Sequence, residues 1–380
     1  MIHPLETDCV VKEVPFVWLM EHELELVPLL ASQPEPTPFQ SLPWLASWLD
    51  AYGQDYDTHI LTVQRNGELI GLVPLMLAKG RAMPVLEWLG AGRSDQAPLL
   101  LRPDSADACL DAIFSFLRAS PFRWCLLSLR TLQPSQHKWL VDRLPADGYL
   151  ADQDDVSPRT VIQGGWDDYL AKKSRKHRGN IKRLLKRAQE LPALQITCVS
   201  EFTSVLLDEI MEVERRSWKA QEGSLRLEGE GRDFYQTFLQ QFSAKRQLEI
   251  WTCRYNETLL AYIITLNYQN AVFYYNGAYR SDCASFDQDL SPGSLLIASA
   301  LKSAHDRGIR TFDFLRGDEP YKKLWVNEER HLYHVVVRAP GLAGLLAEIL
   351  YIRMRWWLRR YPLMHAFRQW VQHIRPAKTG

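Results

Sequence analysis

The sequence predicts an α+β fold built from two similar halves, and two observations lead to this prediction. The segment 60–76 (ILTVQRNGELIGLVPLM) aligns without a gap on the segment 250–266 (IWTCRYNETLLAYIITL), at an offset of half the chain. In addition, a proline opens a helical pattern later in each half, Pro103 in one and Pro292 in the other. We therefore expect each half to hold a mostly antiparallel mixed sheet flanked by helices. Chance similarity between two amphipathic hairpins is the alternative.

The expected elements follow in the same order in both halves. Each aligned segment predicts an antiparallel hairpin, because a polar turn, Asn66-Gly67 or Asn256-Glu257, separates two β-rich apolar runs. A helix is expected within 38–53, where tryptophans and leucines recur at helical spacing. Short strands are expected at 123–129 and 310–315, each after the helix that a proline opens.

Length and composition indicate a folded protein of two or three ordinary domains. The chain has 380 residues, of which 46% are hydrophobic, and 45 Lys and Arg balance 45 Asp and Glu. A uniformly basic surface for nucleic acid is therefore excluded, although local patches are not. The six cysteines are far apart without a C-x-x-C pair, the N-terminus lacks a signal-peptide pattern, and no apolar run is long enough to span a membrane. We expect a cytoplasmic protein without a metal site, since the histidines are dispersed as well.

Four segments are expected along the chain: a lead-in over 1–38, a first domain over 39–155, a second domain over 156–340 and a tail over 341–380. The boundary between the domains is expected at the acidic, turn-prone stretch 151–158 (ADQDDVSP), as a linker. The two domains differ in the residues that could carry chemistry, and the second is expected to be the catalytic one.

The start of the helix opened by Pro292 is the candidate anion-binding site. A β-rich run over 273–278 leads through a polar loop to Ser291-Pro292-Gly293-Ser294 and then to a helix with one apolar stripe. The backbone N–H groups of Gly293, Ser294 and Leu295, together with the positive end of the helix dipole, suit a phosphate. The first half has Asp104 at the matching place, where a carboxylate would repel an anion. Only the second half is therefore expected to bind a phosphate-bearing cofactor.

Asp313 is the candidate general base. It lies in a strand-like run, TFDFLR (311–316), whereas the matching run of the first half, WCLLSL (124–129), is uncharged. Burial would raise the pKa of this carboxyl toward the range that a general base needs. We expect Asp313→Asn to lower turnover far more than it changes the Michaelis constant. A structural ion pair with Arg316 or Arg310 is the alternative.

Four strings of the sequence point together to one family. They are SPGSLLIASALKSAHDRGIRTFDFLRGDEPYKKLW (291–325), WDDYL followed by KSRKHR (166–178), ERRSWK (214–219) and GAGRSD (90–95). The chain resembles, on these strings, the CelD-like acetyltransferases, a group of the GNAT superfamily akin to the FemAB-type aminoacyl transferases, whose members have two tandem GNAT-like halves. The resemblance covers roughly 39–337, and G-D-E-P-Y-K-x-x-W is its most specific part. The usual GNAT cofactor loop, Gln/Arg-x-x-Gly-x-Gly/Ala, is replaced by Ser-Pro-Gly-Ser.

The resemblance implies transfer of an acetyl or longer acyl group from coenzyme A to an amine or hydroxyl. Such a transfer needs an anchor for the pyrophosphate, a base for the acceptor and an acid for the leaving thiolate. The catalytic candidates are Asp313 as the base, with Asp318 or Glu319 as substitutes, and Tyr321 as the acid. The cofactor-binding candidates are Ser291, Gly293, Ser294, Leu295 and Lys322, the last through a phosphate. The substrate-binding candidates are Tyr275, Asn276, Trp218, Arg175, Arg178 and Arg316.

Two segments concentrate positive charge. Residues 172–187 hold nine Lys or Arg and no acid, with an apolar stripe that predicts an amphipathic helix. Its basic face is expected either to be solvated or to attract an anionic acceptor, such as a lipid-linked sugar phosphate or an acyl carrier, the adenosine phosphates, or tRNA. Residues 349–380 hold seven Lys or Arg and no acid, interleaved with Trp356, Trp357 and other apolar residues. This tail suits an anionic membrane interface, with the protein's own surface or another subunit as alternatives.

These observations predict a cytoplasmic acyltransferase that uses acetyl-CoA or another acyl-CoA and no metal. The resemblance alone implies a role in envelope or polysaccharide biosynthesis, and the tail raises peripheral binding to the inner membrane. A FemAB-like aminoacyl transferase that uses aminoacyl-tRNA is one alternative. A non-catalytic module that presents the basic helix to a partner is another.

Overall fold

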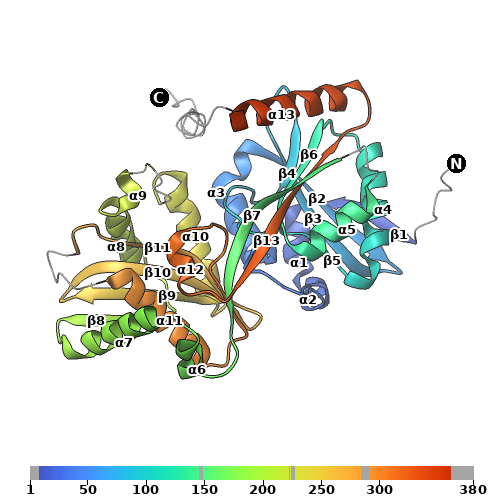
Figure 1. Cartoon of the computed structure of the whole chain (residues 1–380). Coiled ribbons are helices and arrows are strands. Elements are labelled where there is room, and N and C mark those ends of the chain that lie inside the picture. Colours follow the sequence, from blue (N-terminus) through green and yellow to red (C-terminus); the bar gives the residue numbers. More distant parts are fainter. Residues whose placement is uncertain (1–7, 145–148, 222, 224–226, 284–290, 361–380) are drawn as a thin grey trace.

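A computed structural model describes residues 8–144, 149–221, 223, 227–283 and 291–360 (Figure 1). The elements of the first half are β1 (Cys9–Val14), α1 (Phe16–Glu21), α2 (Glu23–Ala31), α3 (Leu42–Tyr52), β2 (Tyr56–Arg65), β3 (Glu68–Ala78), β4 (Val85–Trp88), β5 (Leu100–Leu101), α4 (Ala106–Ala119), β6 (Leu126–Leu132) and α5 (Pro134–Arg143). Short 3-10 helices cover Pro38–Gln40, Gly53–Asp55 and Pro103–Ser105.

The elements of the second half are β7 (Tyr149–Val161), α6 (Trp166–Ala171), α7 (Arg175–Glu190), β8 (Leu194–Val199), α8 (Ser204–Arg215), α9 (Trp218–Gln221), α10 (Glu230–Ala244), β9 (Leu248–Tyr255), β10 (Thr258–Tyr268), β11 (Ala271–Tyr279), α11 (Pro292–Asp306), β12 (Thr311–Asp313), α12 (Pro320–Lys323), β13 (Glu328–Arg338) and α13 (Leu342–Arg360). The mixed α/β fold class is as predicted. Both hairpins are present as β2–β3 and β9–β10. Asn66 and Gly67 both have positive φ, which a two-residue hairpin turn of this hand requires.

Within the described residues, 13 strands form one sheet. Its order is β1-β2-β3-β4-β6-β13-β7-β12-β11-β10-β9-β8, with β5 beside β3. The outer parts repeat each other, because β4 runs parallel to β6 just as β11 runs parallel to β12. The two halves exchange a strand. β7 comes directly after the elements of the first half in the sequence but pairs with β12 of the second half. β13 comes at the end of the second half but pairs with β6 of the first half.

The stretch 151–158, expected to be a linker, is instead the middle of β7. It pairs with β13 from Ala151 opposite Val335 to Pro158 opposite Glu329. Its acidic residues resemble a turn in composition, but they sit on a strand and find partners, such as Arg130 for Asp154. The two long exchanged strands cross from one half to the other at the centre of Figure 1. The repeated halves are therefore parts of one continuous sheet.

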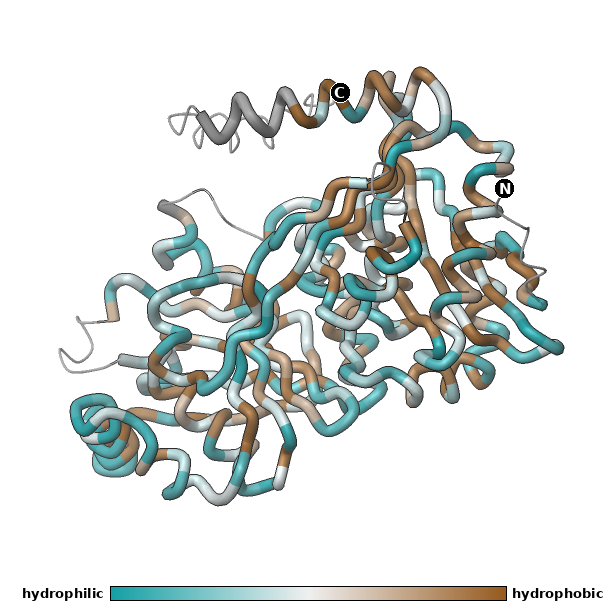
Figure 2. The backbone as a smooth tube through the Cα atoms, turned by 45° about the vertical axis from the view of Figure 1, so that its right-hand side comes forward, coloured by the Kyte–Doolittle hydropathy of each residue, from teal (hydrophilic) through white to brown (hydrophobic). Residues whose placement is uncertain are grey.

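Helices cover the sheet on both faces and bury its apolar side chains. In the second half, α6, α7 and α11 pack on one face through a cluster that includes Leu184, Leu296 and Phe312. A second cluster joins the halves, since Trp44 of α3 contacts Phe234 and Phe238 of α10 edge to face. Figure 2 shows hydrophobic residues along the strands and more polar ones at the periphery. The two hairpin turns, Asn66-Gly67 and Asn256-Glu257, the proline-initiated helices and this apolar patterning explain why the two halves adopt the same arrangement.

Two notches interrupt the sheet, one in each half. β11 and β12 pair only from Ala271 opposite Thr311 to Phe273 opposite Asp313, and β11 then continues alone on that side to Tyr279. β4 and β6 pair only over Val85–Glu87, after which β4 ends at Trp88 and β6 runs on to Leu132. Parallel strands that separate leave main-chain groups without a sheet partner and leave space between them. Each notch is therefore a natural place for a ligand.

Candidate functional site

The notch of the second half holds a cavity of about 420 Å³, called here the second-half cavity. Its walls come from α7, α9, β10, β11, the start of α11 and the segment around α12. The residues that line it are His177, Asn180, Ile181, Leu184, Trp218, Tyr262, Ile263, Tyr274, Gly277, Ala278, Tyr279, Ser291, Gly293, Ser294, Ile297, Glu319, Tyr321, Leu324 and Trp325. The structure thus brings together six residues singled out in the sequence: Ser291, Gly293, Ser294, Trp218, Glu319 and Tyr321.

The first turn of α11 opens into this cavity. The N–H groups of Gly293 and Ser294 precede the first intrahelical bond, from Leu295 N to Ser291 O at 3.0 Å, so the helix itself offers them no acceptor. The first turn contains no acid, whereas the first turn of α4 contains Asp107. A Cβ on Gly293 would lie 3.2 Å from Tyr279 Cδ1, so the backbone here is approached closely. Leu295 itself is buried in the core and does not line the cavity.

Phenols and a carboxylate form the other side of the cavity. Tyr274 is half-buried, and its hydroxyl is hydrogen-bonded to that of Tyr321, which is 39% exposed. Partial burial, with Tyr274 and Glu319 nearby, raises the pKa of Tyr321. The Tyr321 phenol therefore stays protonated at neutral pH and can only give a proton away.

His177 is a cavity residue that the sequence reasoning missed. Burial, with the positive charge of Lys173 as the second cause, lowers the pKa of His177. Its Nε2 is enclosed without a hydrogen-bond partner in the described residues, and the ring meets Trp325 edge to face at 4.8 Å. The imidazole is thus mostly neutral at pH 7 and can accept a proton. The only sequence signal was a histidine within a basic run, which gave no reason to separate it from its neighbours.

Asn276 and Tyr275, expected to line an acyl channel, lie behind the cavity wall. Asn276 is buried in a network in which Lys219 Nζ donates to Asn276 Oδ1 at 2.6 Å and to Glu214 Oε1 at 2.9 Å. Tyr262 joins the network through its hydroxyl, 3.0 Å from Glu214, and is also among the residues that line the cavity. Tyr275 packs on Trp44 on the other side of the strand. The network lies behind the cavity wall, and the charges of Lys219 and Glu214 balance each other within it.

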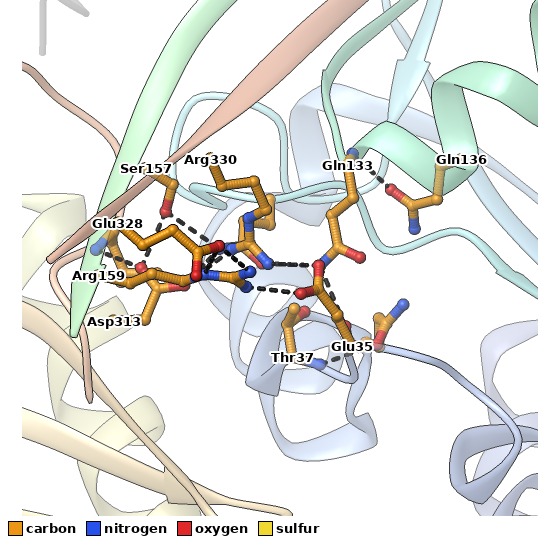
Figure 3. Close-up of polar contacts among 12 residues, drawn as sticks. Glu35, Thr37, Gln133, Gln136, Ser157, Arg159, Asp313, Glu328 and Arg330 are labelled. Carbon is orange, nitrogen blue, oxygen red and sulfur yellow. Dashed lines mark hydrogen bonds and ion pairs between the residues drawn. The ribbon is translucent and has the colours of Figure 1, made fainter. Parts of the chain in front are cut away.

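Asp313 lies in a separate buried cluster, shown in Figure 3. Its carboxylate accepts from Arg330 Nη2 at 2.7 Å, from Ser157 Oγ at 2.8 Å and from Leu315 N at 2.7 Å. Arg330 also binds Glu35 of the lead-in at 2.9 Å. Asp313 lines a cavity of about 240 Å³ that it shares with Glu35 and Arg330 and not with Gly293. The ion-pair partner is therefore Arg330, and the suggested partners Arg316 and Arg310 were wrong.

The remaining candidates are distributed around the loop after β12 and along α7. Lys322 Nζ is buried against the loop carbonyls, 2.8 Å from Arg316 O, and 2.9 Å from Glu319, which leaves it little freedom to meet a phosphate. Asp318 is exposed and pairs with Lys323 at 2.7 Å. Arg175 and Arg178 lie on α7 outside the cavity lining. Arg316 points toward the first half, where its Nε lies 3.6 Å from Asp95.

The described residues contain neither a metal-binding cluster nor a helix that could span a membrane. No group of three or more His, Cys, Asp or Glu in that part of the chain is arranged to hold a metal ion. Over the same residues, every helix is too short or too polar to cross a bilayer.

Comparisons with known proteins agree with this architecture. Residues 175–323, fewer than half of the chain, match the family described as an acetyltransferase (GNAT) domain. A comparison with curated protein sequences gives no significant match.

Solved structures show the same fold at low identity. The crystal structure of FemX is 13% identical, with a TM-score of 0.62 over 90% of this chain and 99% of that one. A conserved protein of unknown function from Bacteroides thetaiotaomicron is 12% identical, with a TM-score of 0.55 over 86% of this chain and 99% of that one. L-PGS from Bacillus licheniformis is 15% identical, with a TM-score of 0.50 over 84% of this chain and 97% of that one. Residues 175–323 thus match a GNAT acetyltransferase domain, and the chain has a two-part fold similar to that of FemX.

Proposed function

We propose that this protein transfers an acetyl or longer acyl group from coenzyme A to an amine or hydroxyl, and that the second-half cavity binds the acyl-CoA. The observation that carries the proposal is the first turn of α11, whose Gly293 and Ser294 amides open into the notch between β11 and β12. Backbone amides at the positive end of a 15-residue helix are suited to a pyrophosphate. The matching helix α4 carries acids near its start, so only one half offers this anchor.

The rest of the cavity fits the remainder of such a ligand. Beyond Phe273 no described strand pairs with the open side of β11, so main-chain groups between Tyr274 and Tyr279 are available to the amides of a pantetheine arm. Apolar side chains such as Ile181, Leu184 and Ile297 line the cavity next to that edge and suit an acyl chain. Acyl-CoA supplies the activated acyl group when it is bound.

The proton-handling groups of the cavity are Tyr321 and His177. Tyr321 is a protonated phenol in the cavity and is the candidate donor of a proton to the leaving sulfur. Its raised pKa keeps the proton in place before the reaction and makes the phenol a weaker acid than a free tyrosine. His177, which is mostly neutral because its pKa is lowered by burial, is suited to accept a proton from the acceptor. Asp313 keeps its charge paired with Arg330 and is better suited to holding the β12 loop in place. Lys322 has a similar loop-holding position.

Gly293→Asp tests the proposal, with Gly293→Ala as the matched control. The aspartate adds a carboxylate at the helix start, so calorimetry with coenzyme A should show at least a tenfold loss of affinity, about 1.4 kcal/mol. The alanine adds only a Cβ beside Tyr279, an exposed and movable side chain, so its affinity should stay within about threefold of the wild type. Equal affinity of Gly293→Asp and wild type would refute the proposed anchor, and no binding to either would favour a non-catalytic module.

Aminoacyl transfer from tRNA is the second candidate, favoured by the basic face of α7 and by the likeness to the FemX fold. Lys176 and Lys182 are exposed on that face, and neither forms an ion pair with another described residue. If tRNA is the donor, its binding should weaken steeply as salt is raised, and coenzyme A should not compete with it.

We also propose peripheral contact with an anionic membrane through α13, for an acceptor of envelope or polysaccharide biosynthesis. Leu342, Leu346 and Leu350 are 79%, 60% and 59% exposed, and Figure 2 shows hydrophobic residues along this helix. The arginines of 353–360 follow directly in the sequence, and Pro362 with the rest of the tail lies outside the described residues. Flotation with anionic vesicles, with and without residues 341–380, tests this contact.

A further inference from the structure

The notch of the first half also holds a cavity, of about 530 Å³, called here the first-half cavity. Its lining is more polar than that of its counterpart and includes one residue of the second half, Arg316. The lining residues are Tyr56, Met76, Glu87, Trp88, Ala91, Gly92, Ser94, Gln96, Pro98, Arg130, Thr131 and Arg316. The position is equivalent to that of the second-half cavity, because β4 and β6 correspond to β11 and β12.

Both notches lie beside the middle of β7. At the end of β6, Thr131 N donates to Asp154 Oδ2 at 3.3 Å. Beyond β12, the loop runs along the same strand until Gly317 N donates to Val156 O at 3.0 Å. Asp154 and Val156 are two residues apart, about 7 Å along a strand. The first-half cavity therefore opens beside the loop that carries Glu319 and Tyr321 into the second-half cavity.

Glu87 is the unusual group of the first-half cavity. It is half-buried on β4, between Met76 and Ser128 on the neighbouring strands. Within the described part of the chain, its carboxylate has neither a hydrogen bond nor an ion pair within 4 Å, and burial raises its pKa although Arg130 and Arg81 oppose this. A half-buried acid left in this state is costly unless a ligand supplies the missing partner.

Positive charge lies in the same cavity. Arg316 Nε is 3.6 Å from Asp95 and 3.8 Å from Asp155, which are distances of attraction rather than of hydrogen bonds. Arg316 therefore still has guanidinium N–H groups to donate. Arg130 pairs with Asp154, yet its side chain is 42% exposed and also lines the cavity. A planar fork of this kind suits a phosphate or carboxylate.

We propose that the first-half cavity is the acceptor subsite and that it takes a molecule with both a primary amine and an anionic group. The ammonium would bind Glu87, and the anionic group would bind Arg316 with the help of Arg130. This inference rests on the proposed acyl transfer and adds the class of acceptor to it. It also gives the first half, whose helix start is closed to anions by acids, a task of its own.

Calorimetry on the full chain with a matched pair of probes tests the subsite. Glucosamine 6-phosphate carries both groups, and glucose 6-phosphate replaces the amine with a hydroxyl. We expect the wild type to bind the amino sugar at least tenfold more tightly. Glu87→Gln should abolish this preference, because the amide keeps the shape but loses the charge, and Arg316→Gln should weaken both probes. Glu68→Gln, which changes an exposed acid on β3 that pairs with Arg102, should alter neither.

Coenzyme A binding and thermal melting of the same variants separate the possible failures. Unchanged coenzyme A affinity and melting temperature in Glu87→Gln, with the preference lost, would support the subsite. Equal binding of both probes by the wild type, or a preference that survives in Glu87→Gln, would overturn the acceptor subsite. Neither result would contradict coenzyme A binding in the second-half cavity. No binding of coenzyme A to the wild type would instead refute the proposed function.

Discussion

Single residues in this protein owe their roles to which side of the sheet they face. Asp313 ends strand β12 and Gly293 lies in the first turn of helix α11, and the two line different cavities. The sequence identified Asp313 correctly as a charge in a buried strand, because alternation between apolar neighbours is visible in TFDFL. It could not identify the partner, since Arg330 lies 17 residues away on β13. His177 was missed for the opposite reason, because nothing local distinguishes it and only tertiary packing against Trp325 encloses it.

Replacing Asp313 should therefore affect stability more than chemistry. Asp313→Asn leaves the Arg330 guanidinium, which is 6% exposed, with Glu35 as its remaining counter-charge. Removing one partner of a buried pair costs up to about 3–5 kcal/mol, and the Glu35 contact keeps the expected loss below that limit. Chemical denaturation should show this loss, while kcat per folded molecule stays close to that of the wild type. The double variant Asp313→Asn with Arg330→Met should recover part of the stability, because it removes the cation that has lost a partner. A large fall in kcat without loss of stability would restore Asp313 as the base.

His177 should set the acid limb of the pH–rate profile. A base must be neutral to accept a proton, and burial lowers the pKa of His177 below its usual 6.5. Activity should therefore be full above this pKa and be lost as the pH falls through it, with a midpoint below 6.5. His177→Gln should lower kcat by about 10²–10⁴-fold and remove that limb. His305→Gln is the matched control, because His305 also has a lowered pKa and an enclosed Nε2 but lies outside the cavity. Equal effects of both variants would refute the role of His177.

At the scale of elements, local signals predicted what is local. The Asn-Gly turn, the tryptophan spacing within 38–53 and Pro292 predicted β2–β3, α3 and the start of α11. Gly308 has a φ of 67°, which a glycine adopts without strain at a helix end. The prediction of a linker at 151–158 was wrong. This stretch belongs to strand β7, which is stabilised by pairing with β13, far along the chain, and not by its own composition. The notches could not be predicted, since they depend on where two strands stop pairing.

The packing of the helices around the second-half cavity shapes the candidate site. α7 lies across α11 through Ile181 and Leu184, which places His177 at one wall while the basic face stays outside. The amphipathic pattern predicted this helix and its apolar stripe. It did not predict that the stripe also lines a ligand cavity, because a stripe buried in a core and one facing a cavity have the same spacing.

For the whole molecule, the exchange of β7 and β13 makes the two halves dependent on each other. The fragment 156–340, which matches the expected second domain, would cut β7 in the middle and would carry β13 without β6, its partner from the first half. The interface cluster of Trp44, Phe234 and Phe238 would also lose one side to water. We therefore expect this fragment to lack a cooperative thermal transition and to bind no coenzyme A. The fragment 1–340 is the control, because it loses α13 but keeps every strand of the sheet, and it should unfold cooperatively and retain coenzyme A affinity. Calorimetric melting of both fragments decides the matter. A cooperative transition and wild-type affinity in 156–340 would mean that the exchanged strands are dispensable and that each half is an independent folding unit.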